Sequence, residues 1–166
     1  MNKQSHRYTE QEAFQKLSAL CAVAEYCKAD MRRKMEHWLL TDAEAEKDAA
    51  AKERVISRLV KEQYIDERRY AHAFVRDKFR YNRWGKLRIQ QELRMKGIAQ
   101  EVIGEALQEL PAEETEETLR RLIEQKRPSV KGQNAYEINM KLMRFALSRG
   151  FEADMARKVI GEWEDF

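Results

Sequence analysis

Hydrophobic residues along this chain recur every three to four positions, which is the spacing of an amphipathic helix. The segment 67–80 shows the pattern clearly, with apolar residues on one helical face: Tyr70, Ala71, Phe74, Val75 and Phe79. The 166 residues include only six glycines and two prolines, too few for the turns of an all-β fold. Strong helix formers such as Ala, Leu, Glu and Lys dominate instead. The pattern therefore predicts an all-α fold.

Capping signals indicate where the helices begin and end. Thr9 and Glu12 have the spacing of a capping box at the start of the first helix. Asp66 is placed to cap a later helix, and Gly97 to end another one in the left-handed conformation. Together with the hydrophobic spacing, these signals predict helices that start near residues 9 and 28, one around 55–60, and others over 67–80, 86–96, 100–110, 113–126, 135–148 and 152–163.

Two early segments need separate interpretation. The helix that starts near residue 28 is expected to carry Met31, Met35 and Trp38 on one face. The stretch 42–53 is polar and rich in alanine, so it fits either a loop or the long solvated start of the helix that follows it.

A shift of 53 positions aligns the middle of the chain with its end. The residues Ile89, Leu93, Gly97, Ile98, Val102, Ala106, Leu107 and Leu110 fall on Leu142, Ala146, Gly150, Phe151, Met155, Val159, Ile160 and Trp163. In the N-terminal third, Met31 and Met35 take the places of Ile89 and Leu93. Chance similarity among amphipathic helices is the alternative, and the matched glycines at 97 and 150 argue against it.

The alignment predicts three tandem three-helix repeats of about 50 residues each, stacked into an elongated, curved helical array. We expect the first repeat, with an N-terminal extension, over residues 1–64. The second and third repeats are expected over 65–111 and 112–166.

Charge is distributed unevenly between these repeats, although the net charge is only +3. Residues 66–97 contain ten lysines and arginines against four acidic residues, whereas residues 101–124 contain eight glutamates against two arginines. The second repeat is therefore expected to carry the basic surface.

The basic residues follow helical spacing. Arg69, His72, Arg76, Arg80 and Arg83 are separated by steps of 3, 4, 4 and 3, and we call this set the basic stripe. The next helix adds Lys86, Gln90 and Arg94 with Arg88 beside them, and the aromatic residues Tyr81 and Trp84 lie between the two groups. The candidate partner- or DNA-binding residues are therefore Arg69, Arg76, Arg80, Arg83, Trp84, Lys86, Arg88 and Arg94.

Such a surface suits either nucleic-acid phosphates or an acidic protein groove, and charge alone does not separate the two. An ordinary solvated helix face is the structural alternative. For Trp84, packing of the helix–turn junction is the alternative to a role as an interface anchor.

No motif for catalysis, nucleotide binding or metal binding stands out, so we expect no cofactor, no metal and no enzymatic activity. Gly85 and Lys86 lack the flanking residues of a phosphate-binding loop. The three histidines are scattered and show no metal-binding spacing with the cysteines. A hydrolase-like enzyme is disfavoured for the same reason.

The two cysteines and the N-terminus bear on localisation. Cys21 and Cys27 match neither a CxxC nor a zinc spacing, so we expect free, buried or half-buried thiols in a reducing compartment. The N-terminus has no apolar signal segment, and the longest apolar run, around 17–24, is too short for a membrane span. We expect a monomeric, soluble, cytoplasmic protein with no membrane partner.

The segment Tyr64–Ile98 resembles the central signature of the RecX family, bacterial regulators of the RecA recombinase. The first run of that signature is matched by Asp66, Glu67, Arg69, Tyr70 and Ala71, with Gln63 where glycine is usual. The second run is matched by Gly85, Arg88, Ile89, Glu92, Leu93, Lys96, Gly97 and Ile98. Similarity extends upstream to Cys27–Met35, where Cys27 and Asp30 replace Ser and Glu, and downstream to the Arg149-Gly150-Phe151 corner.

The resemblance implies tandem three-helix repeats and a non-enzymatic regulator. It implies binding along the groove of the RecA–single-stranded-DNA filament, typically with inhibition of strand exchange, ATP hydrolysis and filament growth. Direct binding of single- or double-stranded DNA is a further implied property. The family motifs define no contact residues, so the binding residues named above rest on the charge pattern. A stand-alone helical nucleic-acid-binding module that does not depend on RecA is the alternative.

Overall fold

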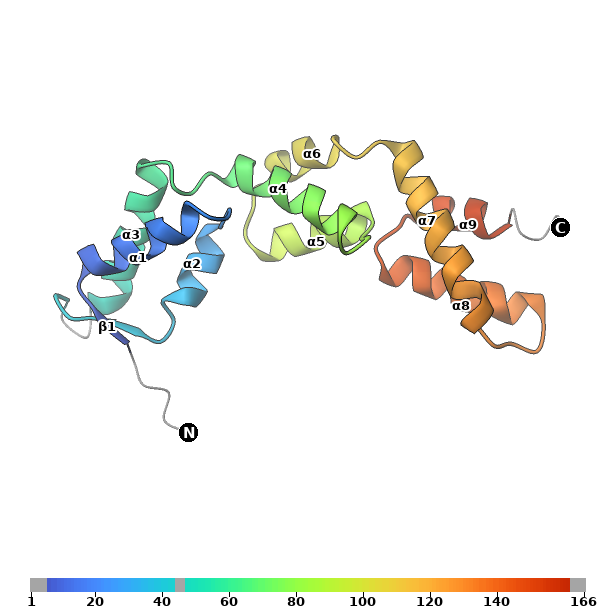
Figure 1. Ribbon diagram of the computed structural model, residues 1–166, viewed down its shortest axis with the longest axis horizontal. Helices are drawn as coiled ribbons and strands as arrows, with labels where there is room; N and C mark the ends of the chain where they lie inside the picture. Colours follow the sequence, from blue (N-terminus) through green and yellow to red (C-terminus); the bar gives the residue numbers. More distant parts are fainter. Residues whose placement is uncertain (1–5, 44–46, 162–166) are drawn as a thin grey trace. The chain divides into compact units, whose positions relative to one another are not determined.

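The computed structural model describes residues 6–43 and 47–161. These residues form an array of helices in repeated three-helix groups, so the predicted all-α repeat fold is confirmed (Figure 1). The chain divides into two compact units, the first ending at Tyr70 and the second beginning at Ala71. Helix α4, Glu67–Arg80, begins in the first unit and continues into the second. The repeat boundaries at 64/65 and 111/112 stay a prediction.

The first unit contains helices α1 (Glu10–Cys21), α2 (Lys28–Lys34) and α3 (Asp48–Lys61). The predicted capping box at the start of α1 is confirmed, since the Thr9 side chain accepts from the Glu12 N–H and the Glu12 carboxylate accepts from the Thr9 N–H. The buried core of the unit is formed by Ala13, Phe14, Leu17, Met31, Met35, Leu40, Ala51, Val55, Ile56, Leu59 and Ile65.

A short parallel sheet in the first unit corrects one expectation. Strand β1 (His6–Tyr8) pairs with β2 (Trp38–Leu40), in the register His6↔Trp38. Trp38 therefore lies in a strand and not on the second helix, which ends at Lys34. Its ring packs edge-on against Tyr8 at 4.7 Å between centroids. Helical spacing alone does not reveal this, because the pairing partner lies about thirty residues away in the chain.

The second unit begins with the rest of α4, followed by α5 (Lys86–Met95) and α6 (Gln100–Leu107). Ile89 and Leu93, one helical turn apart on α5, are fully buried, and Ile103 on α6 joins them. The predicted bounds of α4 are confirmed. Helix α6 ends three residues earlier than predicted, although Leu110 beyond it is still buried.

The remaining helices are α7 (Ala112–Lys126), α8 (Ala135–Ser148) and α9 (Ala153–Gly161), with a short 3-10 turn, η2 (Arg127–Ser129), after α7. Figure 1 shows α9 and α8 lying beside α7. Their shared core contains Leu119, Leu122, Ile123, Leu142, Ala146, Phe151, Ala156, Val159 and Ile160. The predicted bounds of α8 are confirmed, and Trp163, which the repeat alignment places last, lies outside the described residues.

The two aligned glycines, Gly97 and Gly150, adopt the same left-handed conformation, with φ of 77° and 88°. Each ends its helix with the same pair of backbone hydrogen bonds. Gly97 donates to Arg94 while Ile98 donates to Leu93, and the equivalent residues of the other corner repeat this pattern. The aligned glycines therefore mark the same type of helix end in the second and third three-helix groups.

Candidate nucleic-acid or protein interface

Helix α4 presents the centre of the basic stripe to solvent. The Asp66 carboxylate accepts a hydrogen bond from the Arg69 N–H at 2.9 Å and so caps the helix, as predicted. Ala71 and Val75 are buried on the inner side of the helix, whereas Arg76 and Arg80, one turn apart, are exposed. The helical spacing therefore identifies the outward face correctly at these two positions.

Arg69 and His72, two other members of the basic stripe, form hydrogen bonds or polar contacts with other residues of the chain. The Arg69 guanidinium bonds the Glu25 carboxylate at 2.6 Å and also reaches the backbone carbonyls of Gln63 and Tyr64. The hydrogen bond that Arg69 donates to the Glu25 carboxylate raises the pKa of Arg69. His72 Nδ1 lies 2.7 Å from the Glu109 carboxylate. The structure therefore does not present the five stripe residues as one free surface.

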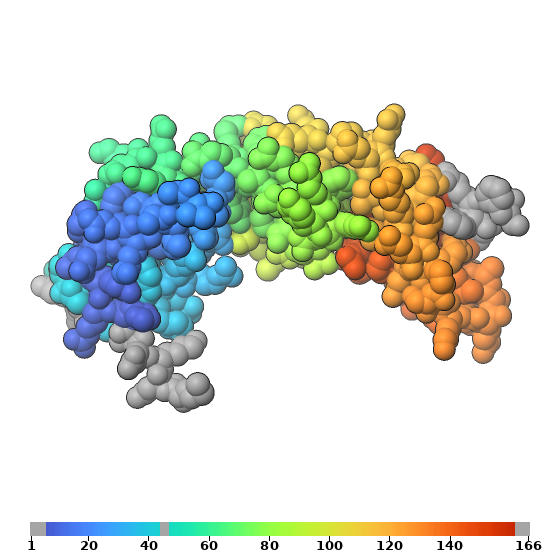
Figure 2. Space-filling view, viewed as in Figure 1, coloured from blue at the N-terminus to red at the C-terminus, as the bar shows by residue number. Residues whose placement is uncertain are grey.

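Arg83 lies in the turn between α4 and α5, where its φ of 54° is left-handed. Its guanidinium donates to the Gln125 side chain of α7 at 3.3 Å. Figure 2 shows the end of α4, in green, next to α7, in orange. Arg83 therefore points toward the third three-helix group of the same unit.

Trp84 follows in the same turn and is half-buried, with two cations over its indole ring. The Arg88 guanidinium carbon lies 4.0 Å and the Lys78 ammonium 5.1 Å from the ring centroid. Contacts of this kind stabilise a cation over an aromatic face. The ring therefore holds basic side chains, a third possibility beyond the packing and anchoring roles considered from the sequence.

A close backbone contact joins this turn to the corner after α8. The Gly85 N–H donates to the Arg149 carbonyl at 2.7 Å, and the Leu87 N–H donates to the Gly150 carbonyl at 3.0 Å. Arg88 Nη1 reaches the Ser148 carbonyl at 3.4 Å. We call this region, residues 82–88 with 148–150, the glycine contact.

Arg149 adds a basic residue that charge spacing missed. Its Nη1 lies 3.4 Å from the Asn82 carbonyl, and its guanidinium carbon lies 5.3 Å from the centre of the Phe145 ring. The Lys126 ammonium lies 5.5 Å from the same ring. Because Arg149 is 67 positions from Asn82, no local periodicity in the sequence connects them.

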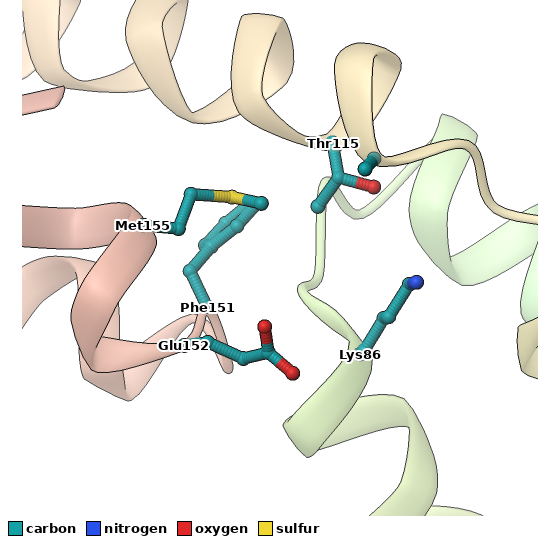
Figure 3. Close-up of a pocket in the computed structure, with 6 residues that line it drawn as sticks. Lys86, Thr115, Phe151, Glu152 and Met155 are labelled. Atoms are coloured by element: carbon teal, nitrogen blue, oxygen red, sulfur yellow. The ribbon is translucent and has the colours of Figure 1, made fainter. Parts of the chain in front are cut away.

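Lys86, predicted as a binding residue, points into a cavity instead of extending along α5 (Figure 3). The cavity has a volume of about 60 Å³, and it is lined by Lys86, Ala112, Thr115, Phe151, Glu152 and Met155. Ligand pockets for drug-sized molecules usually measure ~300–1,000 Å³. The cavity therefore has room for a few water molecules and is too small for a nucleotide.

Arg94 is exposed near the end of α5, where its Nε donates to the Gln100 side chain at 2.9 Å. Across residues 6–43 and 47–161, no carboxylate forms an ion pair with the remaining candidate basic residues, Arg76, Arg80, Arg83, Lys86, Arg88 and Arg94. Arginines elsewhere do form such pairs, for example Arg32 with Glu53 and Arg120 with Glu116. In the part of the chain that the structure describes, a run of basic side chains without an ion pair therefore extends from residue 76 to residue 94.

The described part of the chain contains no group of three or more His, Cys, Asp or Glu side chains suited to a metal ion. Cys27 is buried and Cys21 half-buried, and neither forms a disulfide. Burial raises the pKa of the Cys21 thiol, and the nearby Glu25 raises it further, which disfavours the reactive thiolate. No helix within the described ranges has the length and apolar character needed to cross a bilayer.

Two family models match the chain from residue 66 onward. Residues 66–107 match the second three-helix domain of RecX, and residues 113–160 match the third three-helix domain of RecX. Together the two matches cover more than half of the chain, and all eight candidate binding residues lie within the first match, 66–107.

Several known proteins are similar over longer stretches. The regulatory protein RecX of Bacillus thuringiensis is 31% identical over 111 residues, which is 67% of this chain and 41% of that protein. The Bacillus mycoides protein of the same name is 30% identical over the same coverage. The matched part thus spans less than half the length of these relatives.

Solved structures share the fold. A crystal structure of regulatory protein RecX superposes with a TM-score of 0.76 at 22% identity, covering 92% of this chain and 71% of that one. The RecX structure from Lactobacillus salivarius gives a TM-score of 0.71 at 18% identity, covering 95% and 97% of the two chains. At these identities the similarity establishes the three-helix repeat fold.

Proposed function

Because the chain belongs to the RecX family of regulatory proteins, we propose that it binds the RecA–single-stranded-DNA filament and modulates the RecA recombinase. Inhibition of the ATPase activity and of filament growth is the expected effect. The protein acts by binding and not by catalysis, in the cytoplasm where RecA filaments form. The family membership supports the choice of partner.

The observation that carries this proposal is the set of basic side chains between residues 76 and 94 that form no ion pair within the described chain. A RecA–DNA filament is a nucleoprotein that offers phosphates, and a cationic surface releases counterions when it meets them. Arg76 and Arg80 are exposed on α4, so they are available to a partner without any rearrangement of the fold.

Cosedimentation with filaments of the cognate RecA tests the proposal. Filaments assembled on single-stranded DNA with a non-hydrolysable ATP analogue are pelleted with and without this protein. The proposal predicts that the protein enters the pellet with the filament. Absence from the pellet at low salt, where electrostatic binding is strongest, would contradict it.

A stand-alone nucleic-acid-binding module is the second candidate, because an uncompensated cationic surface can bind DNA without a protein partner. It predicts equal retention on naked DNA and on the filament in the same experiment. A clear preference for the filament would reject this candidate.

A further inference from the structure

Two aromatic rings in the second unit each hold two cations. Lys78 and Arg88 lie over Trp84, and Lys126 and Arg149 lie over Phe145. Within the described ranges, none of these four cations forms an ion pair with a carboxylate. These four residues belong to different helical segments. The tertiary fold therefore brings together basic residues that are separated in the sequence.

The glycine contact brings the two ring clusters together. The Gly85 N–H, directly after Trp84, bonds the carbonyl of Arg149, whose guanidinium lies over Phe145. Arg88, over Trp84, reaches the carbonyl of Ser148 in turn. These hydrogen bonds therefore link the segments that carry the two ring clusters.

The spacing of the cations suits a regularly charged strand. The distances of Lys78 and Arg88 from the Trp84 ring place the two cations at most about 9 Å apart. A DNA strand carries closely and regularly spaced phosphates, so two cations this near each other can meet neighbouring phosphates of one strand.

We propose that this cluster, Lys78, Arg88, Lys126 and Arg149 held over Trp84 and Phe145, binds the phosphodiester backbone of a nucleic-acid strand. The two rings act as positioning residues, because cations already occupy ring faces on which bases would otherwise stack. Recognition is therefore independent of the bases and strongly dependent on salt. This inference rests on the proposed function, and it adds the site that contacts DNA.

The test measures binding without RecA, so its result is separable from that of the filament experiment. Fluorescence anisotropy compares three ligands of equal length at low salt: oligo-dT, an abasic oligonucleotide and polyglutamate. We expect the first two to bind within about threefold of each other and polyglutamate to bind at least about tenfold more weakly. Loss of binding to the abasic strand would overturn base-independent recognition, and equal binding of polyglutamate would indicate an acidic protein ligand instead.

A double variant tests the assignment of residues. Lys78→Gln with Lys126→Gln removes one cation from each ring and leaves the hydrogen bonds of the glycine contact in place. We expect the affinity for oligo-dT to fall about tenfold and the slope of log affinity against log salt to become shallower by about 1.4, since each lost phosphate contact removes ~0.7 on single strands.

The matched control is Lys16→Gln with Lys34→Gln, because these lysines lie over Tyr8 and Tyr26, each at 4.9 Å, in the first unit. The control has the same charge change and also loses two cation–ring contacts. We expect it to bind within about twofold of the unmodified protein. Equal losses in the two double variants, or none in either, would overturn the site. If the DNA-binding test contradicts the site but the protein still binds the RecA filament, the proposed function is retained and only the assigned site is rejected.

Discussion

The backbone of Gly85 lies directly against the backbone of Gly150, so that a Cβ added to Gly85 would lie 2.3 Å from the Gly150 carbonyl oxygen. Gly150 is equally confined, since a Cβ there would lie 2.3 Å from the Cβ of Arg88, three residues after Gly85. Both residues therefore need to be glycine for the second and third three-helix groups to meet as they do.

Replacing Gly85 with alanine is expected to destabilise the second unit by about 3 kcal/mol, because the backbone atoms that it would meet cannot move aside without breaking the glycine contact. Urea denaturation followed by circular dichroism measures the change. Gly104→Ala is the control, since a Cβ there meets nothing within 4 Å and alanine favours the α6 helix by up to ~1 kcal/mol. Equal stability of Gly85→Ala and the unmodified protein would contradict the contact.

The two left-handed glycines are expected to respond differently to alanine. Gly97→Ala is expected to cost about 1 kcal/mol, the strain of a left-handed alanine, because the space around it is open. Gly150→Ala adds the collision with Arg88 and is expected to cost at least about 3 kcal/mol. The comparison of the two free energies of unfolding checks this, and similar costs would show that the close approach is unimportant.

Gln63 is a site where a substitution should stabilise the protein. Its φ of 61° is left-handed, and it ends α3 with the hydrogen-bond pattern seen at the two glycine corners. Gln63→Gly is expected to raise the free energy of unfolding by up to about 1 kcal/mol, because the strain of a left-handed side chain is removed. Glu62→Gly, one position earlier with a φ of −86°, is the control and is expected to destabilise. A loss of stability in Gln63→Gly would contradict the expectation.

Asp48 is expected to make the first unit sensitive to acid. Burial alone would raise the pKa of Asp48, but hydrogen bonds from the Lys52 ammonium and the Leu40 N–H outweigh it and lower the pKa. A lowered pKa in the folded state means that the stabilisation is present above the ordinary carboxyl range and is lost as pH falls through the folded-state pKa.

The variant Asp48→Asn isolates that contribution. At pH 7 the variant should be less stable than the unmodified protein by about 1 kcal/mol, through its lost charged hydrogen bonds. The difference should shrink below about pH 4, where the unmodified carboxyl also becomes protonated. Thermal unfolding at several pH values measures it, and a difference that stays constant down to pH 2 would argue against this role.

Local sequence patterns predicted most of the helical fold. Local interactions, within one or two helical turns, determine the bounds of α4 and α8, the capping box at Thr9 and the two glycine corners. These features can therefore be predicted from the neighbouring residues in the sequence. The strand at Trp38 depends on pairing with His6–Tyr8, and helical spacing assigned that tryptophan to a helix. Long-range pairing of this kind has no local signature.

The candidate site was predictable to the same extent. Spacing on α4 identified Arg76 and Arg80 as exposed, but it could not reveal that Glu25 holds Arg69 or that Lys86 lies at a small cavity. Arg149 was missed because it meets the α4–α5 turn only through tertiary packing. The resemblance of the Arg149-Gly150-Phe151 corner to the family pattern was the one available signal, and it pointed to the glycine.

We propose that the exposed arginines of α4 engage the RecA–DNA filament. Titration of the DNA-dependent ATPase activity of the cognate RecA tests it with Arg76→Glu/Arg80→Glu and the control Arg121→Glu/Arg157→Glu, whose arginines are exposed and form only intrahelical pairs. We predict that the unmodified protein and the control inhibit at substoichiometric amounts, whereas the α4 variant keeps its helix content and requires at least about tenfold more protein. Inhibition by the α4 variant equal to that of the unmodified protein, or no inhibition by the unmodified protein at an equimolar ratio, would contradict the claim.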